Sequence, residues 1–218
     1  MTEIIPAIIA QNFKELEEKI EKVEPYVDWA QLDIMDGQFV GESTWPYAEL
    51  GRGEPSELVN LKTKLNLEAH LMVEKPEEVI EKWIDSGVKR IVFHYEATDK
   101  QKKIIGQIKK GGLEVGLAVN PSTPIGALNE YIAKLDLVLM MTVEPGKGGQ
   151  GLLPEVLVKI RELRQKYPDV RIGADGGINL ETAPSVIRAG ADILAVGSAI
   201  FDGGDIGETI KRLKHAND

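Results

Sequence analysis

The chain has 218 residues, of which 43% are hydrophobic and 28% are charged, the balance of an ordinary globular protein. Its net charge of −9 argues against broad binding to nucleic acid or to anionic membranes, and the absence of cysteine excludes disulfides and thiolate metal sites. The sequence shows no signal-peptide pattern, and no apolar run reaches the roughly 18 residues of a membrane helix. We therefore expect a cytoplasmic protein.

Short apolar runs alternate with longer amphipathic segments along the chain. The apolar runs are rich in Val, Ile and Leu, which is typical of strands buried on both faces, and they span residues 4–9, 29–35, 67–73, 90–94, 115–120, 137–143, 171–174 and 193–196. Helical spacing and end signals, among them Asn12 as an N-cap and Pro76 near a helix start, predict helices within residues 12–24, 75–87, 153–167, 181–192 and 204–218. Between Phe39 and Lys64, glycines and prolines predict a long loop that precedes a helix near residues 56–63.

This order of elements predicts the fold class. Eight strands, each followed by a helix, at about 25 to 30 residues per unit, indicate an α/β protein with a single (β/α)₈ (TIM) barrel over residues 1–218. The main alternative is an open doubly wound sheet, but no glycine-rich dinucleotide fingerprint follows the first strand.

Polar residues stand at the carboxyl ends of several predicted strands, where the active sites of such barrels lie. Asp33 and Asp36 end the second strand, His70 lies in the third, and His94 and Glu96 end the fourth. Each has a simpler explanation on its own, as a turn residue, an interior histidine or local polar packing. Their recurrence at successive strand ends indicates a site.

Glycines follow the last three strands in the motifs "GKGGQG", "DGG" and "GS". Backbone N–H groups without side-chain obstruction, helped by a helix N-terminus, commonly bind phosphate at this place in a barrel, although glycines also make flexible loops. The motifs predict a phosphate site made by Gly146, Lys147, Gly148, Gly149, Gly176, Gly177, Gly197 and Ser198.

Seven motifs together resemble the ribulose-phosphate 3-epimerase family in order and spacing: "LDIMDGQFV", "AHLMV", "FHYEAT", "NPSTP", "EPGKGGQG", "ADGGIN" and "VGSAIF". The resemblance implies a (β/α)₈ barrel that inverts C3 of a phosphorylated ketopentose, interconverting D-ribulose 5-phosphate and D-xylulose 5-phosphate through an enediolate. It further implies that Asp33 and Asp175 are the acid and base, and that these aspartates and His70 bind a divalent metal such as zinc, iron or manganese. A homo-oligomer is also implied, although no sequence stripe indicates one.

The sequence departs from the family pattern at several positions. Gln31 replaces the family's second metal-binding histidine, Ala7 replaces a serine that contacts substrate, and Lys147 replaces a phenylalanine in the phosphate loop. Gln31 shares a strand face with Asp33, and its neutral amide should weaken zinc binding and favour magnesium, manganese or no metal. These departures keep two alternatives open: an epimerase or isomerase for another sugar phosphate, and a non-catalytic phosphosugar-binding protein.

Overall fold

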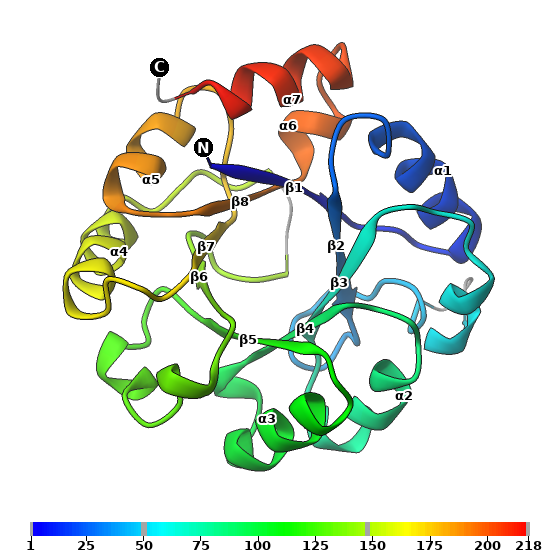
Figure 1. Ribbon diagram of the computed structural model, residues 1–218. Coiled ribbons are helices and arrows are strands. Elements are labelled where there is room, and N and C mark those ends of the chain that lie inside the picture. The colour runs from blue at the N-terminus through cyan, green and yellow to red at the C-terminus, as the bar shows by residue number, and fades with distance from the viewer. Residues whose placement is uncertain (1, 49–51, 147–148, 217–218) are drawn as a thin grey trace.

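The computed structural model describes residues 2–48, 52–146 and 149–216, and within them eight parallel strands form one closed barrel (Figure 1). The strands are β1 (Glu3–Ile8), β2 (Trp29–Met35), β3 (Asn66–Met72), β4 (Arg90–His94), β5 (Glu114–Val119), β6 (Leu137–Met141), β7 (Ile172–Asp175) and β8 (Ile193–Val196). Because β1 pairs with both β2 and β8, the sheet has no open edge. The predicted (β/α)₈ barrel is confirmed, and the open doubly wound sheet is excluded.

The helices form a ring outside the strands (Figure 1). They are α1 (Phe13–Val23), α2 (Ile80–Ile84), α3 (Gln101–Lys110), α4 (Pro154–Lys166), α5 (Ala183–Ala189), α6 (Ser198–Phe201) and α7 (Ile206–Lys214). Short 3₁₀ segments add η1 (Pro55–Asn60), η2 (Pro76–Glu78), η3 (Tyr95–Ala97), η4 (Ile125–Leu128) and η5 (Ile132–Lys134). Among the described residues, no helix has both the length and the apolar character that crossing a lipid bilayer requires.

Several helix predictions need correction in detail. The expectation of an α-helix after every strand is wrong for β2 and β5, which are followed by 3₁₀ turns instead. The predicted helix at residues 75–87 is split, because the φ of −116° at Val79 departs from helical values and separates η2 from α2. For the helix after β4, which is α3, no bounds were predicted, since Gly106 interrupts its pattern, yet Ile104 and Ile108 are buried. The predicted cap is confirmed, with Asn12 Oδ1 accepting from the Glu15 N–H at 3.0 Å.

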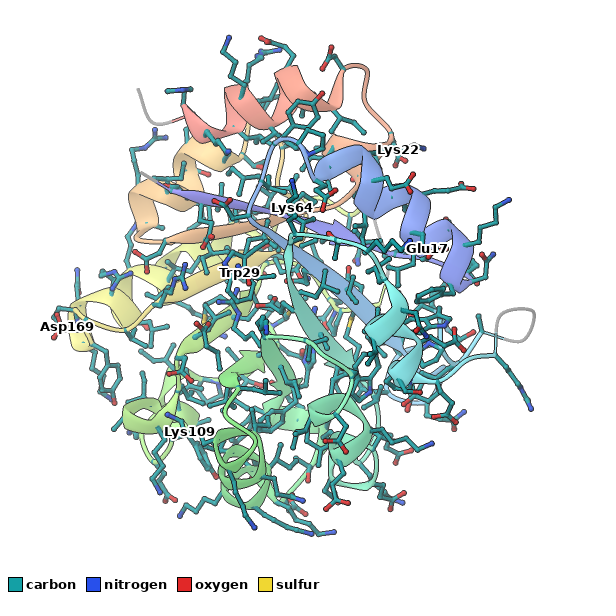
Figure 2. The ribbon with its side chains drawn as sticks, turned by 45° about the vertical axis from the view of Figure 1, so that its right-hand side comes forward. Glu17, Lys22, Trp29, Lys64, Lys109 and Asp169 are labelled. Carbon is teal, nitrogen blue, oxygen red and sulfur yellow. The ribbon has the colours of Figure 1, made fainter. Side chains whose placement is uncertain are left out.

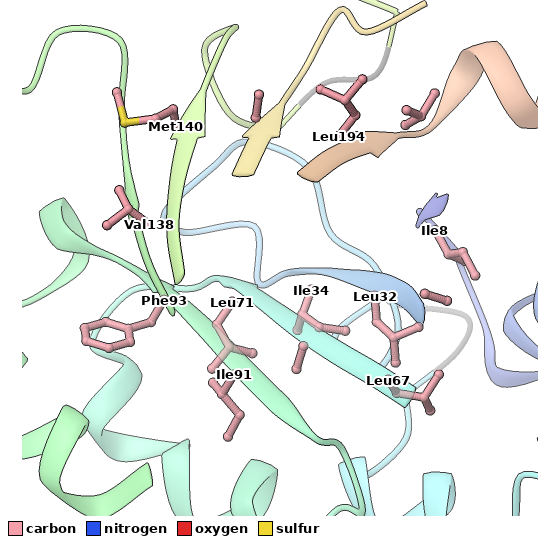
Figure 3. Close-up of a cluster of buried hydrophobic side chains, with 14 of the residues drawn as sticks. Ile8, Leu32, Ile34, Leu67, Leu71, Ile91, Phe93, Val138, Met140 and Leu194 are labelled. Carbon is pink, nitrogen blue, oxygen red and sulfur yellow. The ribbon is translucent and has the colours of Figure 1, made fainter. Parts of the chain in front are cut away.

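Alternation along each strand divides the buried residues into two layers. Outward residues such as Leu32 and Ile34 of β2 and Leu71 of β3 belong to the cluster that packs between strands and helices (Figure 3). A second cluster, which includes Val92, Leu139 and Ile193, fills the inside of the barrel. Asp33, between Leu32 and Ile34, therefore faces the barrel interior, and Gln31, two positions before Asp33, faces the same way.

A buried ion pair lies at the amino-terminal ends of β3 to β5, where Glu68, Arg90 and Glu114 are neighbours in register. Arg90 donates from Nε to Glu68 and, over 3.0 Å, from Nη1 to Glu114 Oε2. Its guanidinium lies 4.2 Å from the centre of the Trp29 ring. Some charged side chains elsewhere lie at the periphery, as Asp169 does (Figure 2). Burial of Arg90 and Glu68 makes their pairing essential to this end of the barrel.

Candidate active site

Four polar side chains meet inside the barrel near the carboxyl ends of β2, β3 and β7. Asp33 lies opposite His70 in the register of β2 and β3, whereas Asp175 arrives from β7 on another side of the barrel (Figure 1). Asp33 and Asp175 keep 7% and 8% of their surface exposed, while Gln31 and His70 keep 1% and 0%. The carboxylates therefore reach the surface of a cleft, and the amide and imidazole lie beneath them.

The Gln31 carboxamide joins the two carboxylates. Its Nε2 donates to Asp33 Oδ1 and to Asp175 Oδ2, each over 2.7 Å. His70 Nδ1 lies 3.2 Å from the same Asp33 oxygen and 3.3 Å from the same Asp175 oxygen. The alternation of β2 predicted that Gln31 shares a face with Asp33, and the structure confirms it.

Burial and neighbouring charges shift the titration of this cluster. Burial raises the pKa of the Asp33 carboxyl, and the negative charge of Asp175 raises it further, although a hydrogen bond from His70 opposes the change. Burial disfavours a charged His70, but hydrogen bonds to Asp175 and Asp33 outweigh it and raise the pKa of His70 to about 10. The site thus combines a carboxyl whose proton affinity is increased with an imidazole within hydrogen-bond distance of it, a pattern suited to proton transfer.

His94 extends the polar cluster behind His70, a role that the sequence left open. The Nε2 atoms of His70 and His94 lie 2.9 Å apart, so one donates a hydrogen bond to the other. His94 Nδ1 lies 3.2 Å from Asn120 Oδ1, and Glu96 accepts from the Asn120 N–H and from the Thr123 hydroxyl. Burial lowers the pKa of His94. His94 therefore fixes the far side of the His70 ring.

Asp36 lies outside this cluster, and the turn interpretation of this residue is confirmed. Its Oδ1 accepts from the backbone N–H groups of Gln38 and Phe39, over 2.8 and 2.9 Å. Its Oδ2 accepts from the N–H of Glu74 over 2.8 Å. Asp36 thus ties the loop after β2 to the loop after β3 and offers no carboxylate to the site.

A cleft opens above the two aspartates, at the carboxyl ends of the strands. The predicted site residues along its wall are Ala7, Asp33, Gly146, Gly149, Asp175, Gly176, Gly177, Gly197 and Ser198. Lys147 and Gly148 lie outside the described residues. Met35, Met72 and Met141 are among the wall residues that the sequence did not predict, because a methionine in an apolar strand gives no sign of facing a ligand.

Two successive glycines after β7 shape one wall of the cleft. Gly176 and Gly177 have φ values of +111° and +63°, which side-chain-bearing residues rarely adopt. A Cβ atom on Gly176 would collide with the Val143 side chain, and one on Gly177 would lie 2.5 Å from the Leu152 backbone nitrogen. Only glycine permits this backbone course, so the "DGG" motif places Asp175 and opens the wall beside it.

Asp33, His70 and Asp175 could together hold a metal ion. Each offers one ligand atom, and these atoms lie within 4.8 Å of one another. Two carboxylates and an imidazole form a donor set that suits several divalent metals, and three protein ligands suffice for a catalytic site that also binds water or substrate. Gln31 presents its N–H group rather than its amide oxygen to this cluster, so the triad alone supplies the ligand atoms.

The whole chain resembles known enzymes in sequence. The model of the ribulose-phosphate 3 epimerase family matches residues 3–201. The ribulose-phosphate 3-epimerase of Schizosaccharomyces pombe is 38% identical over 98% of this chain and 92% of its own length. The enzyme of the same name from Bacillus subtilis is 36% identical over 98% of this chain and 99% of its own length.

Solved structures of lower identity share the fold. A crystal structure of 3-hexulose-6-phosphate synthase has a TM-score of 0.74 at 20% identity and covers all of both chains. Orotidine 5′-phosphate decarboxylase from Pyrococcus horikoshii has a TM-score of 0.68 at 19% identity over 98% of each chain. These likenesses concern the barrel alone. With the family match over nearly its full length, this chain belongs to the ribulose-phosphate 3-epimerase family, a family of enzymes that are epimerases acting on carbohydrates.

Proposed function

We propose that this protein interconverts D-ribulose 5-phosphate and D-xylulose 5-phosphate. The observation that carries the proposal is the pair of carboxylates, Asp33 from β2 and Asp175 from β7, which line one cleft. One aspartate takes the proton from C3, and the electron pair of the broken C–H bond forms an enediolate with the neighbouring carbonyl. The other aspartate donates a proton to the opposite face of C3, and the two carboxyls exchange roles in the reverse direction.

Negative charge that develops on the enediolate is the main obstacle to this reaction, and fixed donors offset it. The N–H group of Gln31 and the imidazole of His70 lie beneath the two carboxylates and moderate their mutual repulsion. A divalent ion bound by Asp33, His70 and Asp175, with zinc, iron, manganese or magnesium as candidates, would supply positive charge beside the enediolate oxygens.

The glycine walls provide a place for the phosphate group. Gly176 and Gly177 follow β7, and Gly197 and Ser198 follow β8, on the same cleft as the two aspartates. Late-strand loops of barrels commonly bind phosphate through backbone N–H groups. A phosphate anchored there leaves C3 of the sugar to extend toward Asp33 and Asp175.

Deuterium exchange at C3 tests the proposal. Each pentulose phosphate is incubated in D₂O with the protein and with added Mg²⁺, Mn²⁺, Fe²⁺ or Zn²⁺, and exchange and epimer formation are followed by NMR. Asp33→Asn and Asp175→Asn should each lower epimerisation by at least about 100-fold, because a general acid or base contributes about 10² to 10⁴. Asp36→Asn is the matched control, since this carboxylate accepts only from backbone N–H groups of the loops after β2 and β3. Folded wild-type protein that turns over neither substrate under any of these conditions would refute the proposal.

A different sugar phosphate is the second candidate substrate. Ala7, which stands where the family has a serine, lines the cleft and offers no hydroxyl. A panel of ketose phosphates that favours another substrate by a large factor would select this alternative. Binding of a pentose phosphate without C3 exchange would select the non-catalytic one.

A further inference from the structure

The amide nitrogen of Gln31 lies at the centre of the three residues that could bind a metal. It is 2.7 Å from Asp33 Oδ1, 2.7 Å from Asp175 Oδ2 and 3.2 Å from His70 Nδ1. Gln31 is itself buried. A primary amide has two N–H donors, and here they are directed to two carboxylates that are 142 residues apart in the chain.

An amide nitrogen at this position and a metal ion compete for the same oxygens. The nitrogen has donors only and cannot serve as a metal ligand. A cation bound to Asp33 Oδ1 and Asp175 Oδ2 would meet the N–H group there, so the carboxamide must turn or withdraw before the ion binds. Turning costs two hydrogen bonds to charged acceptors, which are stronger than neutral ones.

We infer that Gln31 is an internal bridge that stands in for a divalent cation between Asp33 and Asp175 and that a metal must displace. The bridge keeps the two carboxylates together in metal-free protein and weakens metal binding. The inference deepens the proposed function and rests on it in one respect, the assignment of the two aspartates as acid and base. Its measurements concern metal affinity and stability and need no turnover, so either idea can fail without the other.

The opposite role for Gln31 is that of a fourth ligand through its amide oxygen, and one variant separates the two roles. Gln31→Leu preserves bulk but can neither bridge nor ligate. The bridge predicts that Gln31→Leu binds Mn²⁺ about tenfold more tightly by calorimetry, since binding no longer breaks the amide's hydrogen bonds. It also predicts a lower melting temperature in EDTA, because two buried carboxylates lose their shared donor. A Gln31→Leu variant that binds Mn²⁺ more weakly overturns the inference.

Gln101→Leu is the matched control. Gln101 is buried and donates to the backbone carbonyls of Tyr95 and Thr98, away from the two aspartates. The Gln101→Leu variant makes the same substitution and should also lose stability. Its Mn²⁺ affinity and its stabilisation by Mn²⁺ should remain those of the wild type. Gln31→His, which adds an imidazole to the triad, should also bind Mn²⁺ more tightly than the wild type.

A measurement on the wild-type protein serves if Gln31→Leu does not fold. In metal-free protein, the side-chain NH₂ signals of Gln31 in an ¹⁵N spectrum should exchange slowly with water, because both protons are buried in hydrogen bonds. Saturating Mg²⁺ should shift these signals and abolish their protection. Signals that stay protected and unshifted with the ion bound, or that exchange rapidly in its absence, overturn the inference.

Discussion

Replacing Gly177 by alanine tests how the glycine pair after β7 shapes the cleft. At this position φ is +63°, and the added Cβ would lie 2.5 Å from the Leu152 nitrogen and 2.9 Å from the Gln150 carbonyl oxygen. Those neighbours are backbone atoms, which cannot move aside as a flexible side chain can. Gly149 provides a matched control, because its φ is +74° and no atom lies within 4 Å of its added Cβ.

Both variants should lose free energy of unfolding through backbone strain, and only Gly177→Ala should lose more through steric overlap. Each should lose about 1–2 kcal/mol because alanine is forced into left-handed backbone. Gly177→Ala should lose about 1–3 kcal/mol more, the usual effect of overpacking a filled site. We therefore expect a loss of about 2–5 kcal/mol for Gly177→Ala, against about 1–2 kcal/mol for Gly149→Ala.

Urea unfolding with linear extrapolation measures both losses. Gly177→Ala should also raise KM for the sugar phosphate more than Gly149→Ala does. The added Cβ pushes against the backbone at Leu152, and the backbone shift that relieves this clash displaces the cleft wall. Equal losses of stability in the two variants, or a larger loss for Gly149→Ala, would refute the claim that a Cβ at position 177 overlaps the neighbouring backbone.

Three further predictions concern stability. Arg90→Leu should lower the free energy of unfolding in urea by about 3–5 kcal/mol, because it leaves Glu68 buried and unpaired. The double variant Arg90→Leu/Glu68→Leu should recover most of this loss. A double variant as unstable as the single one contradicts the prediction. Burial opposes ionisation of Glu77, but Lys100 outweighs it and lowers the pKa of Glu77 below 4.5, so its contribution is present above pH 4.5 and is lost as pH falls through the lowered pKa. Glu77→Gln should therefore lower the melting temperature at pH 7 and lower it progressively less as pH falls below 4.5, and a loss that does not change with pH refutes the assignment. Asp36→Asn should lower the melting temperature by several degrees, because it weakens the hydrogen bonds that join the loops after β2 and β3. A protease should also cleave these two loops faster. An unchanged digestion pattern contradicts the prediction.

Much of the site could be predicted because local patterns carry it. Apolar runs predicted the strands to within one or two residues of their observed ends. The motifs "MDG" and "DGG" marked the carboxyl ends of β2 and β7. Period-two alternation put Gln31 and Asp33 on one face. The cytoplasmic location and a homo-oligomer stay predictions.

The sequence by itself determined the strand order, the inward face of β2 and the glycines that later line the cleft, because these depend on spacing within a few residues. Only the tertiary structure decided that Gln31 bridges Asp33 and Asp175 and that His94 supports His70. Barrel closure sets those contacts, because it brings side chains far apart in the chain within hydrogen-bond distance. Whether Gln31 would ligate a metal or bridge two acids depends on which end of its amide faces them, and no pattern of residues along one strand encodes that orientation.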